Sequence, residues 1–372
     1  MIRSVFRRAA LPLSLLALLV LSAACRRQVV ETHPTIPLVR EILADKSGPR
    51  MQMLRDQQPR PVSDIAIIGP EFACDRLAEQ FSFRDLQDNV DARFIPDGLP
   101  DFSGETFACI EDTLSYDALL SAGQPEEMRR QTVLRVLAAL DTVVHISPYD
   151  LDGLASKPSA KMVILTDPFL AEYGGFDVDT LLRSSGCAIP VISPIELMID
   201  RAFEQGGRWD LSVGVIGDSR YDGSDIYNRI FSRKAAERGA KGATCVAFSV
   251  AERDSVLHRF LRLYGAAGHV KPLDAILIDD LSVQADSLKN ELAEIVSVMN
   301  ESSMTYGRMF SRNFVFLNSF DTVAERCYAF LRENNLFTHN IAKPQVSVYR
   351  PVRKPQSDDG SIILIPASYV QN

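Results

Sequence analysis

The chain has 372 residues, of which 46% are hydrophobic and 24% charged, a globular composition with room for two domain-sized cores. Its apolar content excludes a disordered chain, and no short repeat indicates a fibrous one. The net charge is −8, and −11 without the three arginines of the first 24 residues, so the chain lacks the cations that nucleic acid binding needs.

The N-terminal 24 residues have the three parts of a secretory signal peptide. Residues 1–8 carry three arginines and no acid, and the apolar stretch 9–24 is too short to span a bilayer comfortably. It ends on small residues before Cys25. The segment LSAAC resembles the lipobox of bacterial lipoproteins, with Ser22 in place of the commonest aliphatic residue. The resemblance implies a lipid on Cys25; the alternatives are cleavage nearby or an uncleaved anchor.

The same resemblance bears on location. Arg26 stands where some lipoproteins carry the aspartate that retains them in the inner membrane. We therefore expect a cell-envelope protein, lipid-anchored in the outer membrane and facing the periplasm, with the membrane as a partner. The polar, proline-containing residues 25–60 are predicted to be a flexible tether with one short helix around 36–43.

The other cysteines give no metal or redox motif. They form no CxxC pair, and an odd number leaves at least one free thiol. Contexts such as FACI and ATCVAF predict buried, inert side chains. The sequence has no histidine pair at metal-ligand spacing, no Walker loop and no GxGxxG, so no metal and no cofactor are expected. The five are Cys74, Cys109, Cys187, Cys245 and Cys327.

From residue 61 onward, short apolar runs typical of strands alternate with amphipathic stretches typical of helices. Residues 91–123 do not fit this alternation and are interpreted as an insertion over a cleft. The elements expected in residues 61–207 are strands at 64–69, 142–147, 161–168 and 188–194, and helices at 130–140, 177–186 and 195–207.

After Trp209 the alternation restarts. Near-continuous apolar strands separated by helices indicate parallel sheets with helices on both faces. The sequence therefore predicts an α/β fold of two Rossmann-like lobes, 61–207 and 208–345, joined by a hinge and followed by a C-terminal tail, 346–372. The second lobe is expected to hold strands at 211–218, 243–250, 273–281 and 313–319, and helices at 224–240, 252–268, 287–303 and 321–335.

This order of elements resembles the type I periplasmic binding protein superfamily over roughly residues 61–350. The resemblance implies a solute-binding protein, not an enzyme, whose two lobes close on a small polar ligand such as a sugar or nucleoside. A second interpretation is a non-catalytic envelope scaffold, with its cleft filled by side chains and another envelope protein as its partner.

Polar residues follow the strands, where open parallel sheets bind ligands. Helix capping is the alternative for each of them, because Asp, Ser and Asn favour cap positions. The predicted ligand-binding residues are Tyr149, Asp150, Thr166, Asp167 and Phe169 in the first lobe and Asp218, Ser219, Arg220, Tyr221, Asp279, Asp280 and Asn318 in the second.

A third interpretation concerns residues 217–219. Their sequence, GDS after a strand, resembles the nucleophile block of SGNH hydrolases, which would make Ser219 an esterase nucleophile. The family's Asp-x-x-His does not occur in this chain, and a serine without a base is a poor nucleophile.

Overall fold

The computed structural model describes residues 34–89, 93–147, 149, 152–206, 209–250, 255–269, 271–299, 307–338, 340–355 and 360–370. Residues 36–372 belong to one unit, which is the subject below. The predictions for residues 1–24 and for lipidation of Cys25 lie outside the described residues and stay predictions. No helix in the described ranges is long and apolar enough to cross a membrane.

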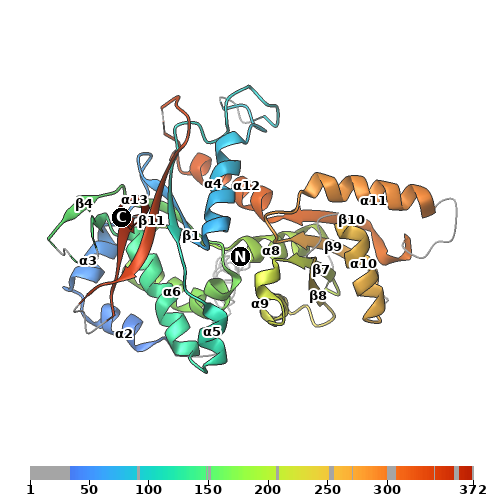
Figure 1. The fold of residues 1–372 in the computed structure, drawn as a ribbon, viewed down its shortest axis with the longest axis horizontal. Helices are drawn as coiled ribbons and strands as arrows, with labels where there is room; N and C mark the ends of the chain where they lie inside the picture. The colour runs from blue at the N-terminus through green and yellow to red at the C-terminus, as the bar shows by residue number, and fades with distance from the viewer. Residues whose placement is uncertain are drawn as a thin grey trace, which may run out of the picture. The chain divides into compact units, whose positions relative to one another are not determined.

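The first sheet has six strands in the order β12-β11-β2-β1-β5-β6 (Figure 1). Neighbouring strands are parallel, except that β12 runs antiparallel to β11. All residues of β1 are buried, as expected for a strand covered on both faces. The bounds are β1 (Asp64–Gly69), β2 (Thr106–Glu111), β5 (Ala160–Leu165), β6 (Val191–Ile192), β11 (Gln345–Arg353) and β12 (Ile362–Pro366).

The second sheet has four parallel strands in the order β10-β9-β7-β8. The predicted fold class, α/β with parallel sheets and helices on both faces, is confirmed. A separate antiparallel pair joins β3 (Val143–His145) to β4 (Leu154–Ser156). The bounds of the second sheet are β7 (Ser212–Gly217), β8 (Thr244–Ser249), β9 (Leu273–Ile278) and β10 (Phe310–Asn318).

Helices cover both faces of each sheet. Three short elements accompany the α-helices: a π-helix, η1 (Leu170–Gly174), and two 3₁₀ turns, η2 (Ser219–Tyr221) and η3 (Gly307–Met309). The α-helices are α2 (Pro37–Ala44), α3 (Pro49–Asp56), α4 (Glu71–Phe83), α5 (Tyr116–Ser121), α6 (Pro125–Leu140), α7 (Gly175–Ser185), α8 (Pro194–Gly206), α9 (Ile226–Glu237), α10 (Val256–Ala266), α11 (Ala285–Met299), α12 (Ser319–Glu333) and α13 (Ala367–Val370).

The alternation of side chains along β1 divides the core of the first sheet. Ile65 and Ile67 pack with α4 and α12, whereas Ala66 and Ile68 pack with α6. The second sheet is divided in the same way, with α10 on one face and α8 and α9 on the other. The cluster around α6 continues through α8 into the second sheet, so the two lobes share one hydrophobic core.

Two helices cross from one lobe to the other. α8 follows β6 of the first sheet but packs on β9 and β10 of the second sheet. α12 follows β10 but packs on the first sheet, and the two helices contact each other. β6 and β10, the strands that precede these helices, therefore end near the junction of the lobes, where Pro194 and Ser319 line the same recess.

Three chain segments, predicted as a tether, an insertion and a tail, form part of the first lobe. Residues 25–60, predicted as a tether with one short helix around 36–43, contain α2 at that place and also α3. Each of the two helices begins at a proline in the first helical turn. Their apolar side chains, Leu38, Val39 and Leu54 among them, are buried in the main core. Residues 346–372, predicted as a tail, contain most of β11 and all of β12. Residues 91–123, interpreted as an insertion, contain the central strand β2.

Asp177 holds the start of α2 against α6 and α7. Its carboxylate is fully buried and accepts hydrogen bonds from the Ile36 amide (3.0 Å) and from Arg129 Nε (2.7 Å) and Nη2 (3.0 Å). A bidentate arginine contact and a backbone donor satisfy both carboxylate oxygens. This contact fixes the backbone at Ile36 against α6 and α7.

We expect Asp177→Ala to lower the free energy of unfolding by about 3–5 kcal/mol, because it leaves the Arg129 guanidinium and the Ile36 amide without their buried partner. Urea denaturation measures the change. The matched control is Asp179→Ala on the same helix, whose exposed pair with Arg183 should change stability by less than about 0.5 kcal/mol. Equal effects of the two substitutions would contradict this account of Asp177.

Candidate active site

A small recess lies where strand ends of the two sheets meet. Its volume is about 10 Å³, room for roughly one water molecule. Thr166 follows β5 of the first sheet, and Asp218 and Asp279 follow β7 and β9 of the second. The lining residues are Ala73, Leu77, Thr166, Pro194, Asp218, Arg220, Tyr221, Asp279, Leu281 and Ser319.

Asp279 is held in the recess by two hydroxyl groups. Tyr227 Oη donates to Oδ2 (2.9 Å), and Ser319 Oγ donates to Oδ1 (2.7 Å). Burial raises the pKa of Asp279 to about 6, although both hydroxyl groups act in the opposite direction. A Cβ at Gly217 would lie 2.5 Å from the Tyr227 ring, so glycine lets this ring cross the end of β7.

Asp167 is the corresponding carboxyl of the first sheet. Its Oδ1 accepts from the Phe169 amide (2.8 Å), and its Oδ2 accepts from Tyr221 Oη (3.2 Å). Burial raises the pKa of Asp167 to about 6. Asp167 does not itself line the recess and is connected to it through Tyr221, whose ring packs edge-on against Phe169 and Tyr227.

Two neighbouring carboxylates, in contrast, are paired with arginines. Asp112, directly after β2, accepts from Arg135 Nη2 (2.8 Å) and also contacts Arg135 Nε and the Tyr116 hydroxyl. Asp218 accepts from Arg220 Nη2 (2.8 Å). In the described part of the chain, Asp167 and Asp279 form no salt bridge with a cation. The junction therefore holds two carboxylates with an arginine partner, Asp112 and Asp218, and two without a salt bridge, Asp167 and Asp279.

Thr166 is fixed by the backbone of β1. Its Oγ1 donates to the Ile68 carbonyl (3.2 Å). A Cβ at Gly69 would lie 1.8 Å from the same oxygen, so only glycine fits at the end of β1. The close approach of these two strand ends positions Thr166, and Asp167 after it, at the junction.

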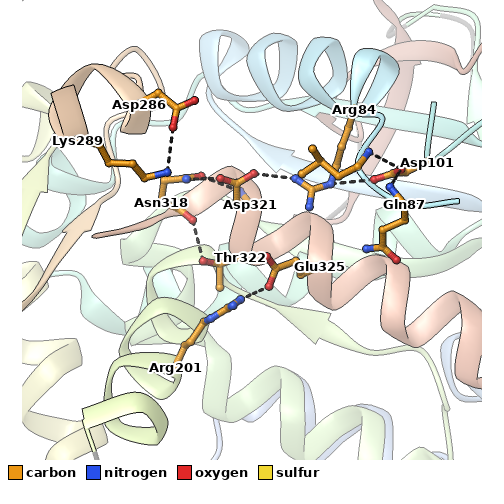
Figure 2. Close-up of polar contacts among 11 residues, drawn as sticks. Arg84, Gln87, Asp101, Arg201, Asp286, Lys289, Asn318, Asp321, Thr322 and Glu325 are labelled. Carbon is orange, nitrogen blue, oxygen red and sulfur yellow. Dashed lines mark hydrogen bonds and ion pairs between the residues drawn. The ribbon is translucent and has the colours of Figure 1, made fainter. Parts of the chain in front are cut away.

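A second recess of about 220 Å³ lies beside the first, between the N-terminal ends of α11 and α12. Asp280 and Asn318 line it, so the neighbours Asp279 and Asp280 face different recesses. Figure 2 shows that Asn318 caps α12: its side chain accepts from the Asp321 amide (2.7 Å). Asp321 in turn accepts from Arg84 Nη1 (2.7 Å), and Arg84 is tied to Asp101 (3.1 Å).

A wider cavity of about 990 Å³ lies at α2, α6 and β11. Its lining includes Arg130 and Glu127, which pair with each other (3.2 Å). Neither Asp167 nor Asp279 lines it. Because perturbed carboxyl groups mark candidate catalytic sites, we place the candidate site at the small recess rather than here.

The structure brings several of the residues predicted from the sequence together, and it separates others. Thr166, Asp218, Arg220, Tyr221 and Asp279 line the recess, and Asp167 and Phe169 lie behind Tyr221. Asp280 and Asn318 line the neighbouring recess. Tyr149 is 93% exposed, on the connection between β3 and β4, and Asp150 lies outside the described residues.

Residues 217–219 form a tight connection. Asp218 caps η2, accepting from the Arg220 amide (2.8 Å), and Ser219 is exposed. The residues that the sequence did not reveal are Asp112, Tyr116, Arg135 and Tyr227. Asp112 follows the apolar run of β2, which could have indicated a polar residue at a strand end. That run lies within residues 91–123, which the sequence suggested were an insertion. Tyr227 lies at an apolar position of a helix, where it is indistinguishable from core. Within the described residues, no three metal-ligating side chains converge.

No protein-family model and no curated protein matches the chain. Solved structures do match. A glutamate racemase from Francisella tularensis in complex with D-glutamate is 13% identical, with a TM-score of 0.45 over 78% of this chain and 88% of that chain. A glutamate racemase from Bacillus anthracis is 12% identical (0.44; 77% and 88%), and an arylmalonate decarboxylase is 14% identical (0.32; 72% and 92%).

These matches correct the functional expectations. They are to racemases and a decarboxylase, so the resemblance to type I periplasmic binding proteins is wrong. The solute-binding function and the expectation that the chain is not an enzyme are wrong with it. The matches support neither the envelope scaffold, nor the SGNH-like esterase at Ser219, nor the description as a lipoprotein with a signal peptide.

The raised pKa of Asp167 predicts a pH-dependent stability. Its ordinary value is 3.8, so the unfolded chain releases this proton near pH 4, whereas the folded chain keeps it to about pH 6. Folding therefore becomes less favourable as the pH rises through this range. Asp167→Asn has no proton to release, so its stability relative to wild type should rise by up to about 3 kcal/mol between pH 4 and 8.

Urea denaturation at a series of pH values measures this difference. Asp179→Asn, which alters an exposed carboxyl, provides the background. Parallel pH profiles for wild type and Asp167→Asn would contradict the assigned pKa.

Proposed function

We propose that the chain is an enzyme that transfers protons to and from a small carboxylate-bearing substrate at the recess between its two sheets. Asp279 acts as the general base, and Asp167 acts as the general acid through Tyr221. The observation that carries the proposal is the pair of buried carboxyls, one from each sheet, whose pKa values are raised to about 6.

The two carboxyls have the acidity that such chemistry needs. A general acid or base works best when its pKa lies near the working pH, because both protonation states are then populated. Asp112 and Asp218 are bound to Arg135 and Arg220 and are suited to structural roles. Asp279 lines the recess, where it can reach a substrate directly.

Tyr221 can connect Asp167 to the substrate. When Asp167 is ionised, the phenol donates its hydrogen to Asp167 Oδ2 (3.2 Å). When Asp167 is protonated, its O–H can donate to the phenol oxygen, and the phenol hydrogen is then free to point into the recess. A proton passed from Tyr221 to the substrate is replaced by the proton of Asp167. Burial keeps the pKa of Tyr221 well above its usual value, so the phenol does not remain ionised.

Arg220 supports the choice of a carboxylate. Its guanidinium lines the recess, and its side chain is 39% exposed. Its partner Asp218 is two residues away on the same turn, so a substrate carboxylate can take the place of Asp218 in an equivalent pair. The recess holds about one water, and admission of a substrate therefore requires the turn η2, which carries Arg220 and Tyr221, to move outward.

The test is proton exchange in heavy water. The protein is incubated with a panel of carbon acids that bear carboxylates: α-amino acids, α-hydroxy acids, D-glutamate (the ligand of the Francisella structure) and an arylmalonate. Proton NMR measures deuterium incorporation. We expect exchange with at least one class, fastest near pH 6, because Asp279 must be ionised while Asp167 is protonated.

Asp279→Asn and Asp167→Asn should each slow this exchange by about 100-fold or more. Asp286→Asn is the matched control, because this carboxyl is 88% exposed on α11, and it should exchange at the wild-type rate. A panel without exchange, or full activity of Asp279→Asn, would contradict the proposal.

A further inference from the structure

Four sulfur-bearing side chains meet in the core between the first sheet and helices α4 and α12. Cys74, Cys109, Cys327 and Met162 are all fully buried. Cys327 lies against the thioether of Met162, with Sγ and Sδ 3.2 Å apart. Cys74 and Cys109 are neighbours, each with its Sγ against the backbone of the segment that carries the other. The proton-transfer chemistry proposed above uses none of these groups.

The positions of Cys74 and Cys109 are fixed by regular structure. Cys109 lies in β2, paired with Ile67 of β1, and its Sγ is 3.7 Å from the Cys74 carbonyl. Cys74 lies in the first half of α4, and its Sγ is 3.7 Å from the carbonyl oxygens of both Ile67 and Ile110. Cys74 Sγ therefore contacts two residues next to Cys109: Ile67, its partner in β1, and Ile110, which follows it in β2.

We propose that Cys74 and Cys109 are a redox pair that forms a disulfide when the chain folds in the presence of a disulfide oxidant. One cysteine thiolate attacks the sulfur–sulfur bond of the oxidant, forming a mixed disulfide and releasing one thiol. The second cysteine thiolate attacks the first cysteine's sulfur and releases the second thiol. Two cysteine thiols are thereby oxidised, the oxidant is reduced to two thiols, and the two cysteine protons pass to the released thiolates.

The bond forms during folding rather than afterwards. Both thiols are fully buried in the folded chain, where an oxidant cannot reach them. The neighbouring Cys109 and burial also raise the pKa of Cys74, which disfavours the reactive thiolate in the folded state. In the structure both cysteines are thiols.

The disulfide would tie one wall of the recess to the first sheet. Ala73 and Leu77, on either side of Cys74 in α4, line the recess, and Asp112 follows β2 three residues after Cys109. Linking α4 to β2 would hold this wall against the strand end. The inference does not depend on the proposed enzymatic function, because it concerns only the state of two thiols.

The test counts thiols in the full chain. The protein is unfolded in reductant, refolded in a mixture of oxidised and reduced glutathione, then unfolded and alkylated with a maleimide. Mass spectrometry should find two fewer alkylated cysteines than in a fully reduced sample, and a proteolytic peptide joining Cys74 to Cys109. Reduction should lower the melting temperature by roughly 5 °C or more.

Cys109→Ser should restore alkylation of Cys74, whereas Cys187→Ser, the control at another buried cysteine, should still lose two thiols. If Cys109→Ser does not fold, the linked peptide of the wild-type chain decides the question alone. Full alkylation of all cysteines after oxidative refolding, or linkage of Cys74 to a different cysteine, would overturn the proposal.

Discussion

The removal of two carboxyl groups from water is the constraint on which the junction of the lobes depends. Asp167 and Asp279 are surrounded by aromatic rings and hydroxyl groups, and no arginine or lysine of the described residues forms a salt bridge with them. A buried carboxylate without an ion pair is unfavourable, so each group keeps its proton to a higher pH. The burial that makes these two carboxylates unfavourable is therefore also what raises their pKa values to about 6.

Several other buried carboxylates of the first lobe have a cation as partner. Asp177 is bound by Arg129, Asp112 by Arg135, and Glu105 by Lys161. Lys161 Nζ also donates to the carbonyls of Pro61 (2.9 Å) and Leu336 (3.1 Å), which joins the start of the sheet to the segment after α12. Such pairs hold distant segments together because breaking one leaves a buried charge alone. Asp167 and Asp279 have no such pair among the described residues; neither has Asp64 in β1, but Asp64 does not line the recess.

The sequence predicted the elements that local chemistry determines. Apolar runs located β1, β5, β7 and β9, and Gly186 ends α7 with a φ of 79°, as a helix-terminating glycine does. It could not predict β11, whose residues alternate and include a proline, because such a strand becomes recognisable only beside β2.

The residues of the candidate site were likewise predictable only in part. Asp167 is visible at a strand end, but its partner Tyr221 is 54 residues away and is brought to it by the fold. Element order alone also did not separate this chain from type I periplasmic binding proteins, since many families alternate strands and helices in a similar sequence.

The return of the chain to its first sheet determines the order in which the protein can be assembled. β11 lies between β2 and β12, so two of the six strands of that sheet are synthesised only after the whole second sheet. During synthesis on a ribosome, the strands of the second sheet are therefore complete before those of the first. The edge of β2 stays unpaired until residues 345–353 have been synthesised. A nascent chain stalled before that point would present an open parallel edge, the kind of surface that chaperones protect from aggregation.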